Sequence, residues 1–114
     1  MSSFFDSEIV LGDLEEIHTI QKKLQKKFFM IPSLSHEERV EFILLLETLV
    51  EKQEIMYFRM KLSDDEESKK MISEIKKSAI ILGVSPETSL EELFDQMKKT
   101  VLNLRKSLDM KSET

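Results

Sequence analysis

Two stretches of the chain carry hydrophobic side chains at alternating spacings of four and three residues. Such a heptad pattern places one apolar stripe along a helix, which lets that helix lie against a neighbour at a shallow angle. The pattern therefore predicts two amphipathic helices, one toward each end of the chain. The first stripe consists of Val10, Leu14, Ile17, Gln21, Leu24 and Phe28, and the second of Leu90, Phe94, Met97, Val101, Leu104 and Leu108.

The stretch between residues 36 and 62 is apolar around much more of the helical circumference. A helix of this kind needs cover on several sides. We therefore expect it at the centre of the fold, surrounded by the other helices or covered in part by a second copy of the chain. Its hydrophobic positions include Val40, Phe42, Ile43, Leu44, Leu45, Leu46, Leu49, Val50, Ile55, Met56, Tyr57, Phe58 and Met60. The stretch over residues 64–82 is predicted to bury a narrower stripe of Met71, Ile72, Ile75, Ala79 and Leu82.

Three breaks separate these stretches, at Pro32, at residues 62–65, and at Gly83 with Pro86. Each following helix is predicted to open with a capping box, in which a serine hydroxyl accepts from the N3 amide and a glutamate reaches back. The first helix is predicted to begin at an Asp6 cap, with Phe5 and Val10 forming a hydrophobic staple. The capping pairs are Ser35 with Glu38, Ser63 with Glu66, and Ser89 with Glu92.

These signals predict helices over residues 7–29, 36–62, 64–82 and 90–110. The expected fold is all-α, a four-helix bundle-like single domain over residues 1–114 with a central, largely buried second helix. The composition agrees, because the chain has only 2 glycines and 2 prolines to interrupt its helices. Hydrophobic residues make up 40% of it, too many for an intrinsically disordered chain.

The charge and the cysteine count exclude several classes of function. With 17 Lys and Arg against 22 Asp and Glu, the net charge of −5 lacks the positive field of nucleic-acid binders, so no nucleic-acid partner is expected. No cysteine is present for a disulfide or a thiolate nucleophile. No apolar run approaches the ~20 residues of a membrane span. We expect a cytoplasmic protein.

One short motif resembles a metal ligand set. Glu15 and His18 form a Glu-x-x-His, the spacing that di-iron bundles use on one helix face. Both residues lie off the apolar stripe, so a solvated surface pair is the favoured interpretation and a metal-binding bundle the alternative. His36 has no identifiable nucleophile beside it, and no phosphate loop or hydrolase motif occurs. We therefore expect no catalytic residue, no cofactor and no metal.

Two clusters are candidate partner interfaces. Lys22, Lys23, Lys26 and Lys27 precede Phe28 and Phe29 and could contact nucleic acid, an anionic membrane surface or an acidic protein. A solvated helix face is the favoured interpretation, because acids balance the same helix.

The second cluster is Phe4 with Phe5, which either pack into the core or anchor a partner. Four methionines of the apolar stripes, Met56, Met60, Met71 and Met97, pose the same question. Methionine-rich surfaces occur in promiscuous binders. Core packing is the favoured interpretation for these four.

Three segments together resemble a family of small uncharacterised proteins, a domain of unknown function shared by cyanobacteria and cyanophages. They are Phe4-Phe5-Asp6-Ser7-Glu8-Ile9-Val10, Leu62-Ser63-Asp64-Asp65, and Leu93-Phe94-Asp95-Gln96-Met97. The resemblance implies an all-helical cytosolic protein and assigns no residue a role. By elimination, the sequence predicts a small, non-catalytic protein–protein interaction or regulatory protein that self-associates and binds an unidentified protein partner.

Overall fold

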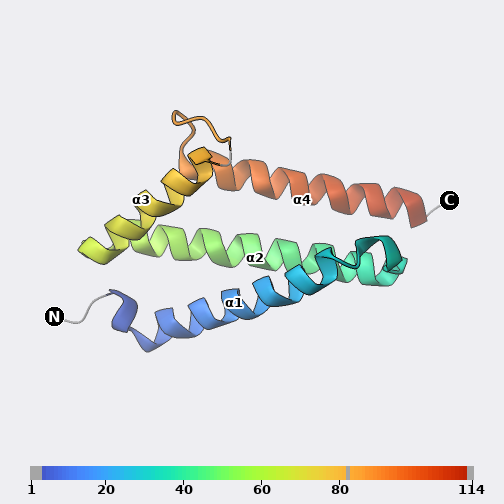
Figure 1. Ribbon diagram of the computed structural model, residues 1–114, viewed down its shortest axis with the longest axis horizontal. Coiled ribbons are helices and arrows are strands. Elements are labelled where there is room, and N and C mark those ends of the chain that lie inside the picture. The colour runs from blue at the N-terminus through green and yellow to red at the C-terminus, as the bar shows by residue number, and fades with distance from the viewer. Residues whose placement is uncertain (1–3, 82, 113–114) are drawn as a thin grey trace.

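The computed structural model describes residues 4–81 and 83–112, and no strand occurs within them. The fold is all-α, as the sequence predicts. Four long helices follow one another with two single turns of 3-10 helix between or before them (Figure 1). In chain order the elements are η1 (Phe4–Asp6), α1 (Glu8–Phe28), η2 (Ile31–Ser33), α2 (His36–Leu62), α3 (Glu66–Ile81) and α4 (Leu90–Ser112).

The second helix is central, which confirms its predicted place in the fold. α1 and α4 lie on opposite sides of α2 and run antiparallel to it, while α3 crosses at one end (Figure 1). The resulting molecule is flat, with extents of 57 × 33 × 21 Å. Its radius of gyration is 16.3 Å, compared with about 13 Å for a compact domain of this size. The helices therefore form a layer with α2 in the middle.

The buried side chains form two hydrophobic clusters instead of one contiguous core. One cluster lies between α2 and α4 and includes Ile43, Val50 and Phe94. The other lies between α1 and α2 and includes Ile17 and Met60. A single side chain, Ile72 of α3, packs against both clusters. Since small domains usually have one contiguous core, α3 acts as the bridge between the two at its end of the layer.

The helix starts follow the predicted capping pattern at two of four positions. Ser35 Oγ accepts from the Glu38 amide at 3.2 Å, and Ser89 Oγ accepts from the Glu92 amide at 3.1 Å. The predicted Asp6 cap is wrong, because Ser7 occupies the N-cap of α1 and accepts from the Val10 amide. That shift also moves Phe5 and Val10 out of staple register, although Phe5 still packs against the cluster that contains Val10.

The predicted capping box of Ser63 with Glu66 is also wrong. α3 begins two residues later than expected, and Asp65 accepts from the Glu67 amide at 3.1 Å. Ser63 Oγ instead accepts from the Asp65 amide, at 3.2 Å. Aspartate caps a helix as well as serine does, and Asp65 also binds the Phe4 amide through Oδ2 at 2.6 Å. This tertiary hydrogen bond favours Asp65 over Ser63.

Several residues of the predicted stripes are exposed. Phe28 ends α1 at the turn into α2, beyond the part of the helix that packs, and Leu104 is exposed on α4. Met71 and Ile75 are exposed because α3 crosses the layer and does not lie along it. The predicted stripe residue Leu82 lies outside the described residues. Val10, Ile17 and Leu24 of the first stripe are buried as expected, and so are Leu90, Phe94 and Val101 of the second.

Candidate protein-binding groove

An apolar groove of about 410 Å³ opens where α3 crosses the layer. η1 and all four helices contribute to it, and eleven of its twelve lining residues are hydrophobic. Its volume lies in the range of ~300–1,000 Å³ that is typical of ligand pockets. The lining residues are Phe5, Leu14, Ile17, Gln53, Met56, Tyr57, Met60, Met71, Ile75, Leu93, Phe94 and Met97.

The groove collects all four methionines that the sequence places in apolar stripes. Met56 and Met60 on α2 are each only 4% exposed. These two are core residues, as the sequence interpretation favours. Met71 on α3 is 40% exposed, and Met97 on α4 is half-buried. Met71 and Met97 thus form an accessible rim of the groove, and the buried Met56 and Met60 form its base. The flexible thioether side chains of the rim can adjust to irregular partners.

Gln53 is the one polar residue in the lining. Its side chain is half-buried, and its amide forms no hydrogen bond within the described part of the chain. A carboxamide provides both donors and an acceptor. Isolated polar groups in an apolar site fix the orientation of what binds there, so Gln53 can hydrogen-bond to a main-chain or side-chain group of an occupant.

The helix pairs are joined by ion pairs that lie on other faces of α2 than the groove. Between α2 and α4, Glu47 pairs with Arg105 at 3.2 Å, Glu54 with Lys98 at 3.0 Å, and Lys61 with Glu91. These positions repeat every seven residues on both helices, so they follow one stripe along each. α1 and α2 are joined by pairs of Asp13 with Arg59, Glu16 with Lys52, and Lys27 with Glu41.

Glu91 is the centre of the polar contacts at the groove end of α4. It accepts from Lys61 Nζ and, at 3.0 Å, from the Tyr57 hydroxyl. The hydrogen bond from Lys61 lowers the pKa of Glu91, and the same bond raises the pKa of Lys61. Burial, followed by the bond to Glu91, raises the pKa of Tyr57. Tyr57 is therefore a neutral donor that turns its hydroxyl to Glu91 and its ring to the groove.

The aromatic residues of the N-terminus lie at the groove. Phe5 lines it, and both Phe4 and Phe5 are half-buried against the cluster between α1 and α2. Their rings meet edge to face, with centroids 5.1 Å apart. Both residues therefore pack within the molecule, and the role of Phe4 and Phe5 in a partner interface stays a prediction.

The lysines of α1 lie away from the groove. Lys22, Lys23 and Lys26 are exposed, whereas Lys27 pairs with Glu41 at 3.4 Å. Glu15 and His18 are exposed on the same helix. No group of three or more His, Cys, Asp or Glu side chains in the described ranges is arranged to hold a metal ion. Nor is any described helix long and apolar enough to cross a membrane.

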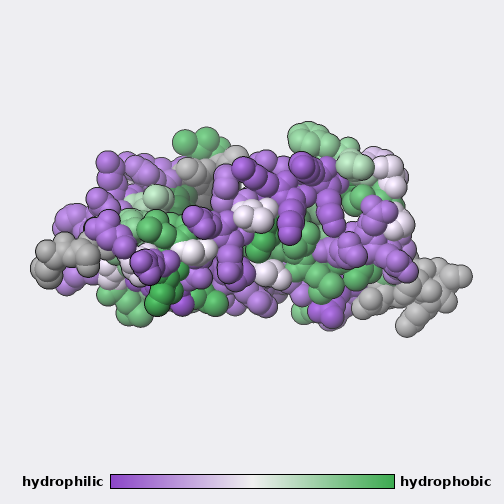
Figure 2. Space-filling view, turned by 90° about the horizontal axis from the view of Figure 1, so that it is seen from below, coloured by the Kyte–Doolittle hydropathy of each residue, from purple (hydrophilic) through white to green (hydrophobic). Residues whose placement is uncertain are grey.

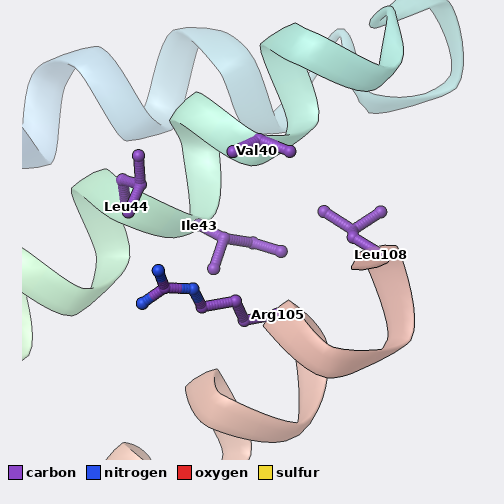
Figure 3. A pocket seen from close by; sticks show the side chains of 5 residues that line it. All are labelled: Val40, Ile43, Leu44, Arg105 and Leu108. Carbon is purple, nitrogen blue, oxygen red and sulfur yellow. The ribbon is translucent and has the colours of Figure 1, made fainter. Parts of the chain in front are cut away.

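A smaller hollow of about 130 Å³ lies between the far ends of α2 and α4. Ile43 and Leu108 extend toward each other across it, and the Arg105 side chain reaches from α4 toward α2 (Figure 3). Arg105 is held there by Glu47, so its aliphatic stem covers apolar surface while its charge is paired. This hollow is a packing feature of the seam and offers little room to a ligand.

Sequence reasoning missed the exposed apolar turn that follows α1. Phe28, Phe29 and Met30 are 62%, 84% and 55% exposed, and we call these three residues the tip. The two rings meet edge to face, 5.9 Å apart. The available signal was their position directly before the Pro32 break, where a heptad stripe no longer has a neighbouring helix to contact.

Comparison with known proteins gives a family and no function. No curated protein and no solved structure matches the chain. One family model matches it over residues 2–108, which is nearly its whole length. The chain therefore belongs to the DUF1825 family, which is described as a domain of unknown function.

Proposed function

We propose that this chain is a small, non-catalytic interaction protein that binds an amphipathic helix of another protein in its methionine-lined groove. The observation that carries the proposal is the groove itself, with eleven hydrophobic residues around a single amide. Helix-in-groove recognition uses such a surface, and the ligand contributes apolar anchors at spacings of three and four residues. The groove supplies contact area and one orienting group, the requirements of a binding site.

The exposed rim supports binding of a partner over a purely structural role. Met71 and Ile75 extend from α3 over the groove and remain accessible to solvent. Seen from the α1 edge, most of the molecular surface is hydrophilic, and hydrophobic residues show through in separate patches (Figure 2). Apolar surface rimmed by polar residues is typical of protein interaction sites.

Affinity capture from a cyanobacterial lysate tests the proposal, since the family resemblance implies such a host. The test variant is Met71→Lys, which places a charge at the groove rim on an exposed position. The matched control is Ile81→Lys, on the same helix at a residue that is 84% exposed and outside the lining. We expect the wild type and the control to retain the same partner and Met71→Lys to lose it. Equal capture by all three proteins would refute the groove as the site.

A second candidate function is binding to an anionic surface through α1. Lys22, Lys23 and Lys26 are exposed, and none of them is in an ion pair with another described residue. They lie next to the exposed rings of Phe28 and Phe29. Binding to anionic vesicles or RNA that weakens steeply with salt would favour this function. Replacement of the three lysines by glutamine would abolish such binding and leave partner capture through the groove unchanged.

A further inference from the structure

The tip is an ordered turn, although its side chains are exposed. The Met30 amide donates to Lys27 O at 3.0 Å, and the Ser33 amide donates to Met30 O at 2.9 Å. The Leu34 amide closes the turn on Ile31 O at 3.2 Å, and Leu34 itself is buried. A preformed turn loses little conformational freedom when it binds. Phe28, Phe29 and Met30 are therefore presented as a fixed apolar projection.

The tip and the groove lie at opposite ends of the molecule. The groove is at the end where α3 crosses, and the tip is at the turn from α1 to α2 (Figure 1). Phe28 of the tip and Ile17 of the groove lining lie on the same helix, α1. Eleven residues of that helix hold them about 16 Å apart, so a tip cannot reach the groove of its own chain. Two copies placed side by side in opposite directions bring each tip next to the groove of the other copy.

The charges of α1 fit the same antiparallel arrangement. Exposed acids, Glu8 and Glu15, lie on the half of α1 toward the groove. Exposed lysines, Lys22, Lys23 and Lys26, lie on the half toward the tip. No ion pair within the described chain engages any of these five charges. In an antiparallel pair of copies the lysines of one α1 approach the acids of the other, which favours this orientation over the parallel one.

We propose that the groove of each copy binds the tip of a second copy in a two-fold symmetric dimer. The inference rests on the groove of the proposed function, and it makes the tip and a partner helix competitors for one site. Two identical tip–groove contacts satisfy the closed symmetry of most small homo-oligomers. A second copy also fits better than an anionic bilayer, which the net charge of −5 on the whole chain repels.

Sedimentation of the full chain gives the first test. We expect the wild type to have twice the 13.4 kDa mass of one chain. The double variant Phe28→Ser, Phe29→Ser should be monomeric. The control Leu102→Ser, at a residue of α4 that is 47% exposed and outside both the tip and the groove lining, should remain dimeric. A monomeric wild type, or a tip variant that still dimerises, would overturn the proposal.

Cysteine pairing gives the second test and separates this dimer from others. The natural chain has no cysteine, so Phe29→Cys and Met71→Cys each introduce a unique thiol, one at the tip and one at the groove rim. A mixture of the two variants should form mixed cross-links with a short thiol cross-linker, and neither variant alone should cross-link efficiently. Cross-linking of either variant with itself, or the absence of mixed products, would contradict tip–groove contact.

The outcomes also distinguish this dimer from the proposed function and from membrane binding. If the wild type is monomeric while Met71→Lys still abolishes partner capture, the groove function stands and the dimer is excluded. If the wild type is monomeric and sediments with phosphatidylserine vesicles, but Phe28→Ser, Phe29→Ser does not, the tip binds a bilayer and the dimer is likewise excluded.

Discussion

Asp65 shows how one side chain can decide where a helix begins. It caps α3 through Oδ1 and binds the Phe4 amide through Oδ2, so it holds η1 against the start of α3. Serine at position 63 had the expected capping spacing but no such second contact. A carboxylate with two acceptor oxygens can satisfy two separate backbone donors. This double role explains why α3 starts at Glu66 and why the N-terminal aromatics remain beside the groove.

We predict that Asp65→Ala lowers the free energy of unfolding by about 1–2 kcal/mol, the upper part of the range for loss of an N-cap. The bond to the Phe4 amide is lost as well, so Phe4 and Phe5 should also become more exposed. Thermal or urea unfolding measures the first effect. The control is the neighbouring Asp64→Ala, whose fully exposed side chain makes only a 3.8 Å contact with Lys69. An equal loss in both variants would contradict the role of Asp65.

The methionines of the groove should separate into two classes by stability. Met60→Ala removes a side chain that is almost wholly buried between α1 and α2, so we expect a loss of about 2–5 kcal/mol. Met71→Ala removes an exposed one, so we expect a change within about 0.5 kcal/mol. Chemical denaturation of both variants measures the difference. If Met71→Ala were as destabilising as Met60→Ala, Met71 would be a core residue and could not serve as a rim for partners.

At the scale of the helices, charge and apolar surface are divided between different faces of α2. The ion pairs to α1 and α4 fix the register of both antiparallel neighbours. The face with Gln53, Met56 and Met60 has no ion pair between described residues and contacts apolar side chains of α1 and α3. Exposed ion pairs contribute little stability each. Their regular spacing is therefore better explained as a device for register than as the source of the free energy of folding.

The contacts of Glu91 predict how stability depends on pH. Because the pKa of Glu91 is lowered in the fold, its contribution is present above its unfolded value of about 4.3 and is lost as the pH falls through the folded value. The pKa values of Lys61 and Tyr57 are raised, so their contributions are present below about 10 and are lost at higher pH. We expect a plateau in melting temperature between these limits and a decline on both sides.

The variant Glu91→Gln provides the control for that profile. Glutamine retains an acceptor for Tyr57 but removes the carboxylate that titrates and that pairs with Lys61. The decline in melting temperature below the plateau should then become shallower than in the wild type. If the melting temperature fell equally at low pH in the wild type and the variant, other carboxylates would determine acid unfolding.

Across the whole molecule, the other helices cover the hydrophobic side chains of α2 unevenly along its length. α3 bridges the two clusters at one end through Ile72. Toward the other end of α2, Phe42, Leu46 and Leu49 stay half-buried. The molecule is flat and its apolar face is partly open. Its radius of gyration therefore exceeds that of a compact domain with the same number of residues. The proposed dimer would cover the groove and the tip, two of the places where a single copy leaves large apolar side chains in solvent.

Hydrogen exchange should reveal this unevenness. We expect amides of α2 to exchange slowest, because α2 takes part in both clusters. Amides of α3 should exchange fastest among the four helices. Apart from the buried Ser68, α3 packs against the two clusters through the half-buried Ile72 and can open locally without disrupting either seam. Exchange measured by mass spectrometry, peptide by peptide, provides the comparison. Equal protection of the α2 and α3 amides would contradict the expectation that α3 opens locally while the two seams stay intact.

Local sequence patterns were sufficient to predict the four helices and the central place of α2. Capping by Ser35 and Ser89, and the heptad spacing in α1 and α4, depend on residues within a few turns of each other, so local patterns identify them. Local patterns did not predict that Met71 is exposed while Met60 is buried, that Asp65 caps α3, or that Phe28 extends into solvent. These outcomes depend on the angle at which α3 crosses and on where α1 stops packing against α2. Contacts between residues far apart in the chain set that geometry, and the periodicity of a single helix carries no information about it.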